Sequence, residues 1–229
     1  SMDFGAAAPS NRVIYNTVDG VLAGTAISFS DNNSINNIRA QDSGITYGLV
    51  AGTVGRLGVI TSPDCGIDTI LTGVYTTENL LNVKFGLNSD NALISGNNNT
   101  LIFTNNGVDF TVVPTPATQV GLTIRAAYPI SETHYLIGYD NIAGQLFCTT
   151  DAGATWEQVP CAGIGFSTNI FDIGFVSKHV GYMAAVDSVY RTIDGGSTWK
   201  LVYGPIAASN LFHVLVCPNN VNTVLVVGN

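Results

Sequence analysis

The chain has 229 residues, a formal net charge of −8 and an isoelectric point near 4.5. Its hydrophobic content of 46% is too high for a disordered chain, and the acidic balance argues against binding to a nucleic-acid backbone. No uninterrupted apolar run approaches the roughly 18 residues of a membrane-spanning helix, so we expect no membrane insertion.

Ser1-Met2 looks like the remnant of an expression tag, and no signal peptide follows it, so we expect residues 1–229 to be a single domain excised from a longer protein. The four cysteines contain no Cys-x-x-Cys pair, and we therefore expect no metal site and no cofactor. Cys148 and Cys161 flank one predicted hairpin, where a disulfide is an open alternative to two free thiols. Cys65 and Cys217 are expected to be buried free thiols.

The strands come in units of four with a period of roughly 40–50 residues, which is typical of propellers and solenoids. The chain begins with an orphan third strand, Arg12–Thr17, and an orphan fourth strand, Val21–Ile27. The predicted first strands are Ile35–Ala40, Leu80–Phe85, Leu122–Ala127, Ile170–Phe175 and Leu211–Val216. The second strands are Tyr47–Gly52, Asn91–Gly96, His134–Gly138, Gly181–Ala185 and Asn222–Gly228, and the later third strands are Leu57–Ser62, Thr100–Thr104, Gln145–Thr149 and Ser188–Thr192.

A turn motif separates the third strand from the fourth strand in each unit. Its glycines are Gly20, Gly66, Gly107, Gly153 and Gly196. The two complete copies are Thr149-x-Asp151-x-Gly153-x-Thr155-Trp156 and Thr192-x-Asp194-x-Gly196-x-Thr198-Trp199. The Thr hydroxyl and Asp carboxylate can bond backbone N–H groups of a tight turn, the glycine can take a positive φ, and the tryptophan supplies a large ring to bury. The motif therefore predicts a β-hairpin.

The two ends of the chain are complementary, because it stops after a second strand and starts with a third. We therefore predict an all-β, five-bladed β-propeller of four-stranded antiparallel blades, with the ring closed by strands from both termini. Such closure removes the exposed sheet edges that favour aggregation. A fragment of a larger propeller is the alternative.

The motifs Thr149–Trp156 and Thr192–Trp199 resemble the BNR, or Asp-box, repeat of sialidase-like and photosystem II assembly-factor-like propellers. The resemblance implies that each box lies on the hairpin between the third and fourth strands, on the outer rim, and has a structural role. A sialidase would also need an arginine triad and a Phe/Tyr-Arg-Ile-Pro element. Tyr190-Arg191-Thr192-Ile193 lacks the proline, so the resemblance does not carry sialidase catalysis with it.

The first strands of a propeller converge on its axis, and their alignment shows two polar columns. The first column contains Asn37, Asn82, Thr123, Asp172 and His213. The second contains Arg39, Lys84 and Arg125, followed by Gly174 and Leu215. Three cations at equivalent places predict a channel site for a carboxylate, sulfate or phosphate group. The alternative is that each cation pairs with a neighbouring acid and only fills the channel.

These features favour a non-enzymatic binding module that engages a glycan or protein surface through the face opposite the Asp boxes. One alternative is a sialidase-like glycoside hydrolase acting on an anionic sugar, which would need two carboxylates roughly 5–10 Å apart, such as Asp172 with Asp140 or Asp187. The other is a scaffold for assembly of a larger complex. The low charge suits an extracellular, periplasmic or virion surface, and the sequence does not define the oligomeric state.

Overall fold

The computed structural model describes residues 12–14, 17–18, 21–22, 27–29, 35–40, 47–61, 66–87, 89–140, 145–159, 169–206, 210–217 and 220–229. Four antiparallel sheets of four strands follow one another along the chain. The first contains β5 (Ile35–Ala40), β6 (Tyr47–Gly52), β7 (Leu57–Thr61) and β8 (Gly66–Leu71). The second contains β9 (Leu80–Phe85), β10 (Ala92–Gly96), β11 (Leu101–Thr104) and β12 (Thr111–Val112).

The third sheet contains β13 (Thr123–Pro129), β14 (Tyr135–Asp140), β15 (Leu146–Thr149) and β16 (Glu157–Gln158). The fourth contains β17 (Ile170–Phe175), β18 (Gly181–Ala185), β19 (Val189–Thr192) and β20 (Lys200–Tyr203). A 3₁₀ turn, η1 (Ala117–Gln119), links the second sheet to the third. None of the helices in the described ranges is long and apolar enough to span a membrane.

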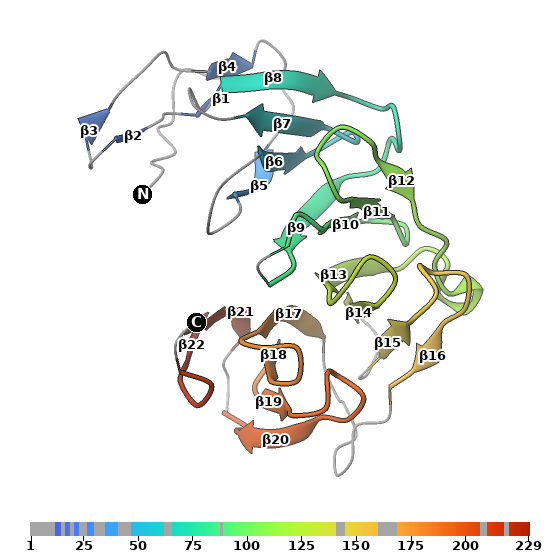
Figure 1. Ribbon diagram of the computed structural model, residues 1–229, viewed down its shortest axis with the longest axis vertical. Helices are drawn as coiled ribbons and strands as arrows, with labels where there is room; N and C mark the ends of the chain where they lie inside the picture. Colours follow the sequence, from blue (N-terminus) through green and yellow to red (C-terminus); the bar gives the residue numbers. More distant parts are fainter. Residues whose placement is uncertain are drawn as a thin grey trace.

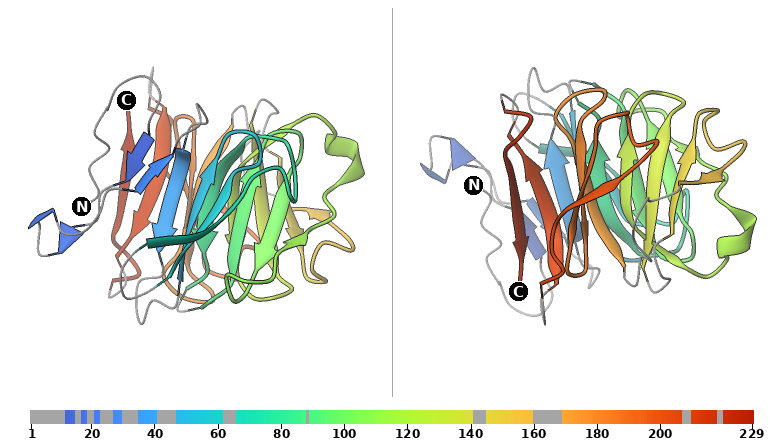
Figure 2. Two further views of the ribbon diagram at one scale, coloured as in Figure 1. Left: turned by 90° about the horizontal axis from the view of Figure 1, so that it is seen from above. Right: turned by 90° about the horizontal axis from the view of Figure 1, so that it is seen from below.

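The sheets stand around a central axis, with β5, β9, β13, β17 and β21 innermost and β8, β12, β16 and β20 outermost (Figure 1). Viewed from the side, the strands of successive sheets stand upright next to one another (Figure 2). This arrangement agrees with the predicted strand order within each unit. The predicted all-β architecture of four-stranded antiparallel sheets is therefore confirmed.

The predicted closure of the ring is not seen among the described strands. β21 (Leu211–Val216) and β22 (Val224–Gly228) form a two-stranded sheet. The N-terminal strands form two separate pairs, β1 (Arg12–Ile14) with β4 (Ile27–Phe29), and β2 (Thr17–Val18) with β3 (Val21–Leu22). The arc in Figure 1 remains open between β22 and β5. The blade count and the closure by both termini thus remain predictions.

The apolar core lies between neighbouring sheets. Tyr47 and Leu49 of β6 pack with Ile94 of β10 and Ile102 of β11 in one buried cluster. Equivalent clusters join the second sheet to the third, the third to the fourth, and the fourth to β21 and β22. Each sheet is therefore stabilised mainly by apolar area buried against its neighbours.

Both complete Asp boxes adopt the predicted hairpin between the third and fourth strands. In the second box, the Thr192 hydroxyl donates to Asp194 (2.7 Å) and accepts from the Gly196 N–H (2.9 Å). Asp194 in turn accepts from the backbone N–H of Thr198 at 2.9 Å. The same set of bonds recurs around Asp151. Hydrogen bonds from Thr155, first the hydroxyl and then the N–H, lower the pKa of exposed Asp151 to about 2.

The two tryptophans are buried to different extents. Trp199 is almost completely buried and its indole N–H donates to Gly196 O in its own loop. Trp156 is half-buried and its indole N–H donates at 2.8 Å to Pro114 O, in the segment that follows β12 of the second sheet. Trp199 thus stabilises its own hairpin, whereas Trp156 joins its hairpin to the segment that follows the preceding sheet.

The weaker copies of the box differ from expectation. Gly107 is at a positive φ, as predicted, but the polar partners in that turn are the Thr104 hydroxyl and the Asn106 side chain. Gly66 is not a turn residue, because it begins β8 and pairs with Thr61. Gly20 lies outside the described residues.

The box glycine marks a close contact with the preceding sheet. A Cβ atom on Gly153 would lie 2.4 Å from Val113 Cγ1 and 2.8 Å from Pro114 O, and φ is +88°. Gly153→Ala therefore combines left-handed backbone strain with overpacking, and we expect it to lower the free energy of unfolding by about 3 kcal/mol in urea denaturation.

The matched control for this substitution is Gly73→Ala, since Gly73 has φ +68° with no atom within 4 Å of an added Cβ. We expect it to cost only the backbone strain, about 1–2 kcal/mol. Equal losses in the two variants would contradict the role of the box glycine as a spacer between sheets.

Candidate functional site

The inner strands bring several of the predicted polar residues together near the axis. Asp172, the third residue of β17, and His213, the third residue of β21, lie towards the start of their strands. The far end of β17 leads to a turn in which His179 O accepts the N–H of Gly195 in the Asp box. Asp172 and His213 therefore lie towards the face opposite the boxes, as predicted. Asn37 and Arg39 occupy the corresponding places in β5, but their side chains lie outside what the structure describes.

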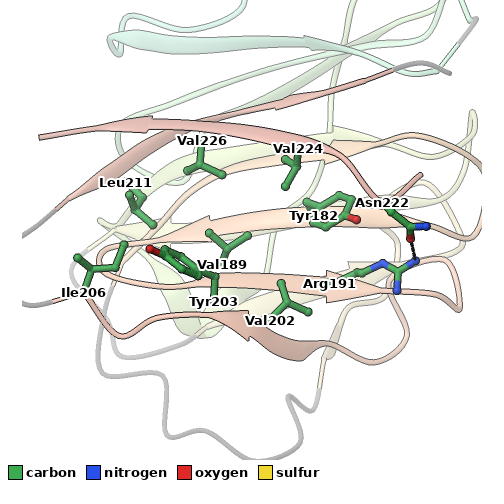
Figure 3. A pocket seen from close by; sticks show the side chains of 10 residues that line it. All are labelled: Tyr182, Val189, Arg191, Val202, Tyr203, Ile206, Leu211, Asn222, Val224 and Val226. Atoms are coloured by element: carbon green, nitrogen blue, oxygen red, sulfur yellow. Dashed lines mark hydrogen bonds between the residues drawn. The ribbon is translucent and has the colours of Figure 1, made fainter. Parts of the chain in front are cut away.

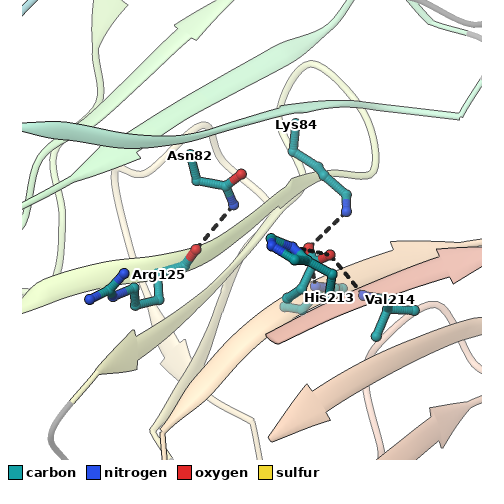
Figure 4. Close-up of polar contacts among 7 residues, drawn as sticks. Asn82, Lys84, Arg125, His213 and Val214 are labelled. Atoms are coloured by element: carbon teal, nitrogen blue, oxygen red, sulfur yellow. Dashed lines mark hydrogen bonds and ion pairs between the residues drawn. The ribbon is translucent and has the colours of Figure 1, made fainter. Parts of the chain in front are cut away.

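The centre of the site is the Asp172 carboxylate, which is almost completely buried. Its Oδ1 accepts from Lys84 Nζ of β9 at 2.7 Å and from the Ile173 N–H at 2.8 Å. Its Oδ2 accepts from the Val214 N–H of β21 at 3.0 Å and lies 3.8 Å from His213 Nδ1. Lys84 and His213 approach this carboxylate from different strands (Figure 4). Asp172 thus joins three inner strands. Lys84 belongs to β9, which is separated from β17 by the inner strand β13.

These partners set the ionisation state of Asp172. Burial by itself raises the pKa of the carboxyl, but the Lys84 ammonium, His213 and the Val214 N–H together outweigh it. The pKa of Asp172 therefore lies below its ordinary value. At neutral pH Asp172 is an anion already bound to protein donors, which leaves it poorly suited to donate a proton.

Arg125 is also paired with an acid. Its Nε donates to Asp140 Oδ2 of β14 at 2.9 Å, while its side chain remains 45% exposed. The Asn82 amide donates to the Arg125 carbonyl at 3.0 Å (Figure 4). The two described cations of the second predicted column are therefore both paired. Lys84 and Arg125 each neutralise a buried carboxylate, and Arg125 still presents part of its guanidinium to solvent.

A hollow of about 150 Å³ lies over this cluster. Its lining residues are Leu81, Asn82, Lys84, Arg125, Phe171, Asp172, Phe212 and His213. The rings of Phe171 and Phe212 meet edge to face with their centroids 5.2 Å apart. Asp172 is the only acid among the lining residues within the described part of the chain.

Register shifts in the inner strands place several of these side chains. Each of the five inner strands skips one residue in its pairing with the second strand, and the skipped residues are Asn36, Leu81, Arg125, Phe171 and Phe212. Four of the five line the hollow. Bulges of this kind redirect side chains and are frequent beside functional sites. In β13 the skipped residue falls three positions later than in the other strands, so Arg125 does not repeat the setting of Lys84.

The remaining polar candidates lie elsewhere. Cys148 is a free, half-buried thiol with its Sγ 3.2 Å from His134 Nε2, and burial followed by the charge of Glu157 raises its pKa to about 11. Cys217 is also free and half-buried, while Cys65 and Cys161 lie outside the described residues. In the described ranges, no three His, Cys, Asp or Glu side chains are grouped so that they could hold a metal ion.

Solved structures of β-propellers are similar to this chain. YCF48 from Cyanidioschyzon merolae matches 99% of this chain and 91% of its own, with 14% identity and a TM-score of 0.60. The β-propeller domain of Cps50 (Swd1) from Myceliophteria thermophila matches 80% of this chain and 64% of its own, with 8% identity and a TM-score of 0.56. An ancestral GH74 enzyme matches 76% of this chain at 17% identity and a TM-score of 0.54, and the chain spans only 24% of that enzyme.

No protein-family model matches the sequence, and no curated protein matches it either. At identities between 8% and 17%, the likeness shows the fold alone. Together with the radiating antiparallel sheets, it establishes that the chain is a β-propeller. Each four-stranded sheet is accordingly a blade.

Lys84→Met tests the part played by the ion pair. It leaves a nearly buried carboxylate without its cation, and we expect the free energy of unfolding at pH 7 to fall by about 3 kcal/mol. In the wild type the lowered pKa of Asp172 stabilises the fold above about pH 4, and this contribution is lost as the pH falls. In the variant, burial without Lys84 raises the pKa of Asp172, so protonation at low pH removes the cost of burying an unpaired carboxylate. The difference in the free energy of unfolding between the two proteins therefore narrows.

Urea denaturation at pH 7 and at pH 3.5 measures that gap. Lys178→Met removes an exposed lysine from the β17–β18 turn, and we expect it to stay within about 0.5 kcal/mol of wild type at both pH values. A gap for Lys84→Met that is constant with pH would contradict the assigned ion pair.

Proposed function

We propose that the protein is a non-enzymatic recognition module that binds a glycan or a protein surface on the face opposite the Asp boxes. Binding occurs at the hollow around Asp172, which we call the channel mouth. The observation that carries this proposal is the composition of the hollow. A partly exposed guanidinium, an exposed imidazole and two phenylalanine rings surround a carboxylate that is already neutralised. Such a mouth offers donors and apolar area to a ligand without a free catalytic acid.

The chemistry of the acids favours binding over glycoside hydrolysis. A glycosidase needs two carboxyl groups, one of which keeps its proton at working pH. Asp172 has a lowered pKa, and Asp140 is bound to Arg125. Asp187 accepts from the Ser188 hydroxyl and does not line the hollow. A sialidase-like reaction therefore has less support than binding, and a scaffold for assembly of a larger complex is the other alternative.

We further propose that the arc is part of a five-bladed ring, in which β21 and β22 are the first two strands of the fifth blade. The four complete blades support this count, because β21 packs beside β17 as each first strand packs beside the one before it. We also propose an extracellular, periplasmic or virion setting, which is supported by the charged content of only 10%.

Binding to a glycan array and a peptide array, both including acidic members, tests the recognition proposal. The variant Arg125→Ala/His213→Ala removes the two exposed donors of the mouth and leaves the Lys84–Asp172 pair in place. We expect wild-type protein to bind a restricted set of probes and the variant to lose at least tenfold in affinity, because charge-assisted bonds contribute about 1.5–3 kcal/mol each.

Lys178→Ala/Lys200→Ala serves as the control, because it removes two exposed positive charges outside the mouth. We expect it to bind like wild type. Binding to glycans alone or peptides alone decides between the two ligand classes. No binding to either array, or equal losses in the two variants, would overturn the assignment of the mouth as the binding site.

A further inference from the structure

Three apolar side chains at equivalent positions surround the hollow of the channel mouth, and we call them the apolar rim. Leu81 of β9, Phe171 of β17 and Phe212 of β21 are each the second residue of an inner strand and the residue skipped in its pairing. All three line the hollow and stay partly exposed, Phe212 to 38%. Apolar groups clustered in solvent gain free energy when a ligand covers them, so the rim favours a ligand with an apolar part. A larger apolar groove of about 550 Å³, beside β19, β20 and β22, does not face this rim (Figure 3).

The Arg125 guanidinium presents an unused edge to the same hollow. Its Nε donates to Asp140 Oδ2 at 2.9 Å, and 45% of the side chain is exposed. Among the described residues, neither of its Nη groups meets a hydrogen-bond acceptor. The two Nη groups form a planar fork, which matches the two oxygens of a carboxylate. Arg125 can therefore hold its own acid and a second carboxylate at the same time.

The lining offers a ligand few acceptors. Asp172 is the only acid among its described residues, and it already accepts from Lys84 and from two backbone N–H groups. The hydroxyl groups of a sugar need acceptors for their protons as well as donors, whereas a carboxylate only accepts. The lining is thus better matched to a carboxylate than to a sugar ring.

The size of the hollow limits what can enter it. Its volume is about 150 Å³, well below the roughly 300–1,000 Å³ of pockets that enclose a whole small-molecule ligand. The hollow therefore takes one group of a larger ligand, whose other contacts fall on the surrounding face. A polypeptide meets this requirement by inserting one side chain.

We propose that the ligand is a polypeptide segment in which an aspartate or glutamate adjoins an aromatic or aliphatic residue. This proposal rests on the recognition function proposed above and names the ligand class of the same site. The inserted carboxylate accepts from the Nη fork of Arg125, and the apolar neighbour packs on Phe171 and Phe212. The His213 imidazole, whose side chain is 57% exposed, borders the same hollow and supplies a further donor.

An array of peptides with acetylated N-termini and amidated C-termini tests the ligand class, because side chains are then the only carboxylates. Each peptide with glutamate next to phenylalanine or leucine is paired with the same peptide carrying glutamine. We expect wild-type protein to bind the glutamate members at least tenfold more tightly, since the charge-assisted bonds are lost with glutamine. A duplicate set with free C-termini separates a side-chain carboxylate from a terminal one.

Two kinds of variant separate the two halves of the site. We expect Arg125→Gln to bring the glutamate and glutamine peptides within about twofold of each other. Arg125→Lys keeps a cation for Asp140 but lacks the fork, and we expect most of the glutamate preference to be lost there too. Phe212→Ser should keep the glutamate preference and lose the preference for an adjacent apolar residue. Lys178→Gln removes the same charge as Arg125→Gln outside the hollow and should bind like wild type.

The possible failures are distinguishable. Equal binding of glutamate and glutamine peptides by wild-type protein would overturn the carboxylate assignment. A glutamate preference that persists in Arg125→Lys, in protein whose circular dichroism matches wild type, would overturn the role of the fork. Binding only to free C-termini would overturn the choice of a side chain. Binding to acidic glycans and to no peptide would keep the recognition function and overturn this proposal, whereas no binding to either array would overturn both.

Discussion

The Asp172 carboxylate is the constraint on which the channel mouth depends. A buried carboxylate is costly unless its oxygens are bonded and its charge is balanced. Here both oxygens accept hydrogen bonds, and the bonds come from β9, β17 and β21. The arrangement holds Lys84 of β9 across the central axis of the inner strands, with His213 beside the same carboxylate. What remains for a ligand is the outer layer of the mouth, where Arg125, His213 and the two phenylalanine rings are partly exposed.

The rest of the molecule is organised by packing between neighbouring blades. Each buried cluster is shared by two sheets, and the box glycines lie where a hairpin touches the blade before it. The stability of a blade is therefore coupled to that of its neighbours, as in other repeat architectures. The sheet of β21 and β22 illustrates the consequence. It shares a buried cluster with the fourth blade, and its other face exposes Leu215, Leu225 and Val227.

The fold was largely predictable because its signals are local. Turn chemistry in Thr149–Trp156 and Thr192–Trp199, with alternating apolar strands at a fixed period, gives the strand order inside each blade. In the turn at Gly107, the Asn106 amide takes the place of the Asp carboxylate and accepts a backbone N–H in the same way. The pattern Thr104-x-Asn106 in the sequence could have predicted this turn. Gly66 shows the limit of such matching, because a glycine at the right spacing lies in a strand there.

The site was less predictable, since its main contact joins the second blade to the fourth. Sequence alignment placed Lys84 and Asp172 in two different columns, but it does not show that a lysine on one inner strand reaches an acid two strands away. It also missed Phe171 and Phe212, whose positions depend on register shifts that no local pattern marks. The later shift in β13 separates Arg125 from the column it shares with Lys84 in the alignment. Closure of the propeller ring by strands from both termini is a proposal, because the structure does not describe the side chains of the N-terminal strands.

The most direct measurement is a carbon-detected NMR titration of the Asp172 carboxyl group, assigned by comparison with Asp172→Asn. If the mouth is a recognition surface built over a carboxylate that protein donors hold ionised, the pKa of Asp172 lies below the ordinary aspartate value of about 3.9. We then expect no titration of this carboxyl near neutral pH. A pKa raised well above that value would identify a protonated acid at the channel mouth. That result would contradict the account and favour hydrolysis.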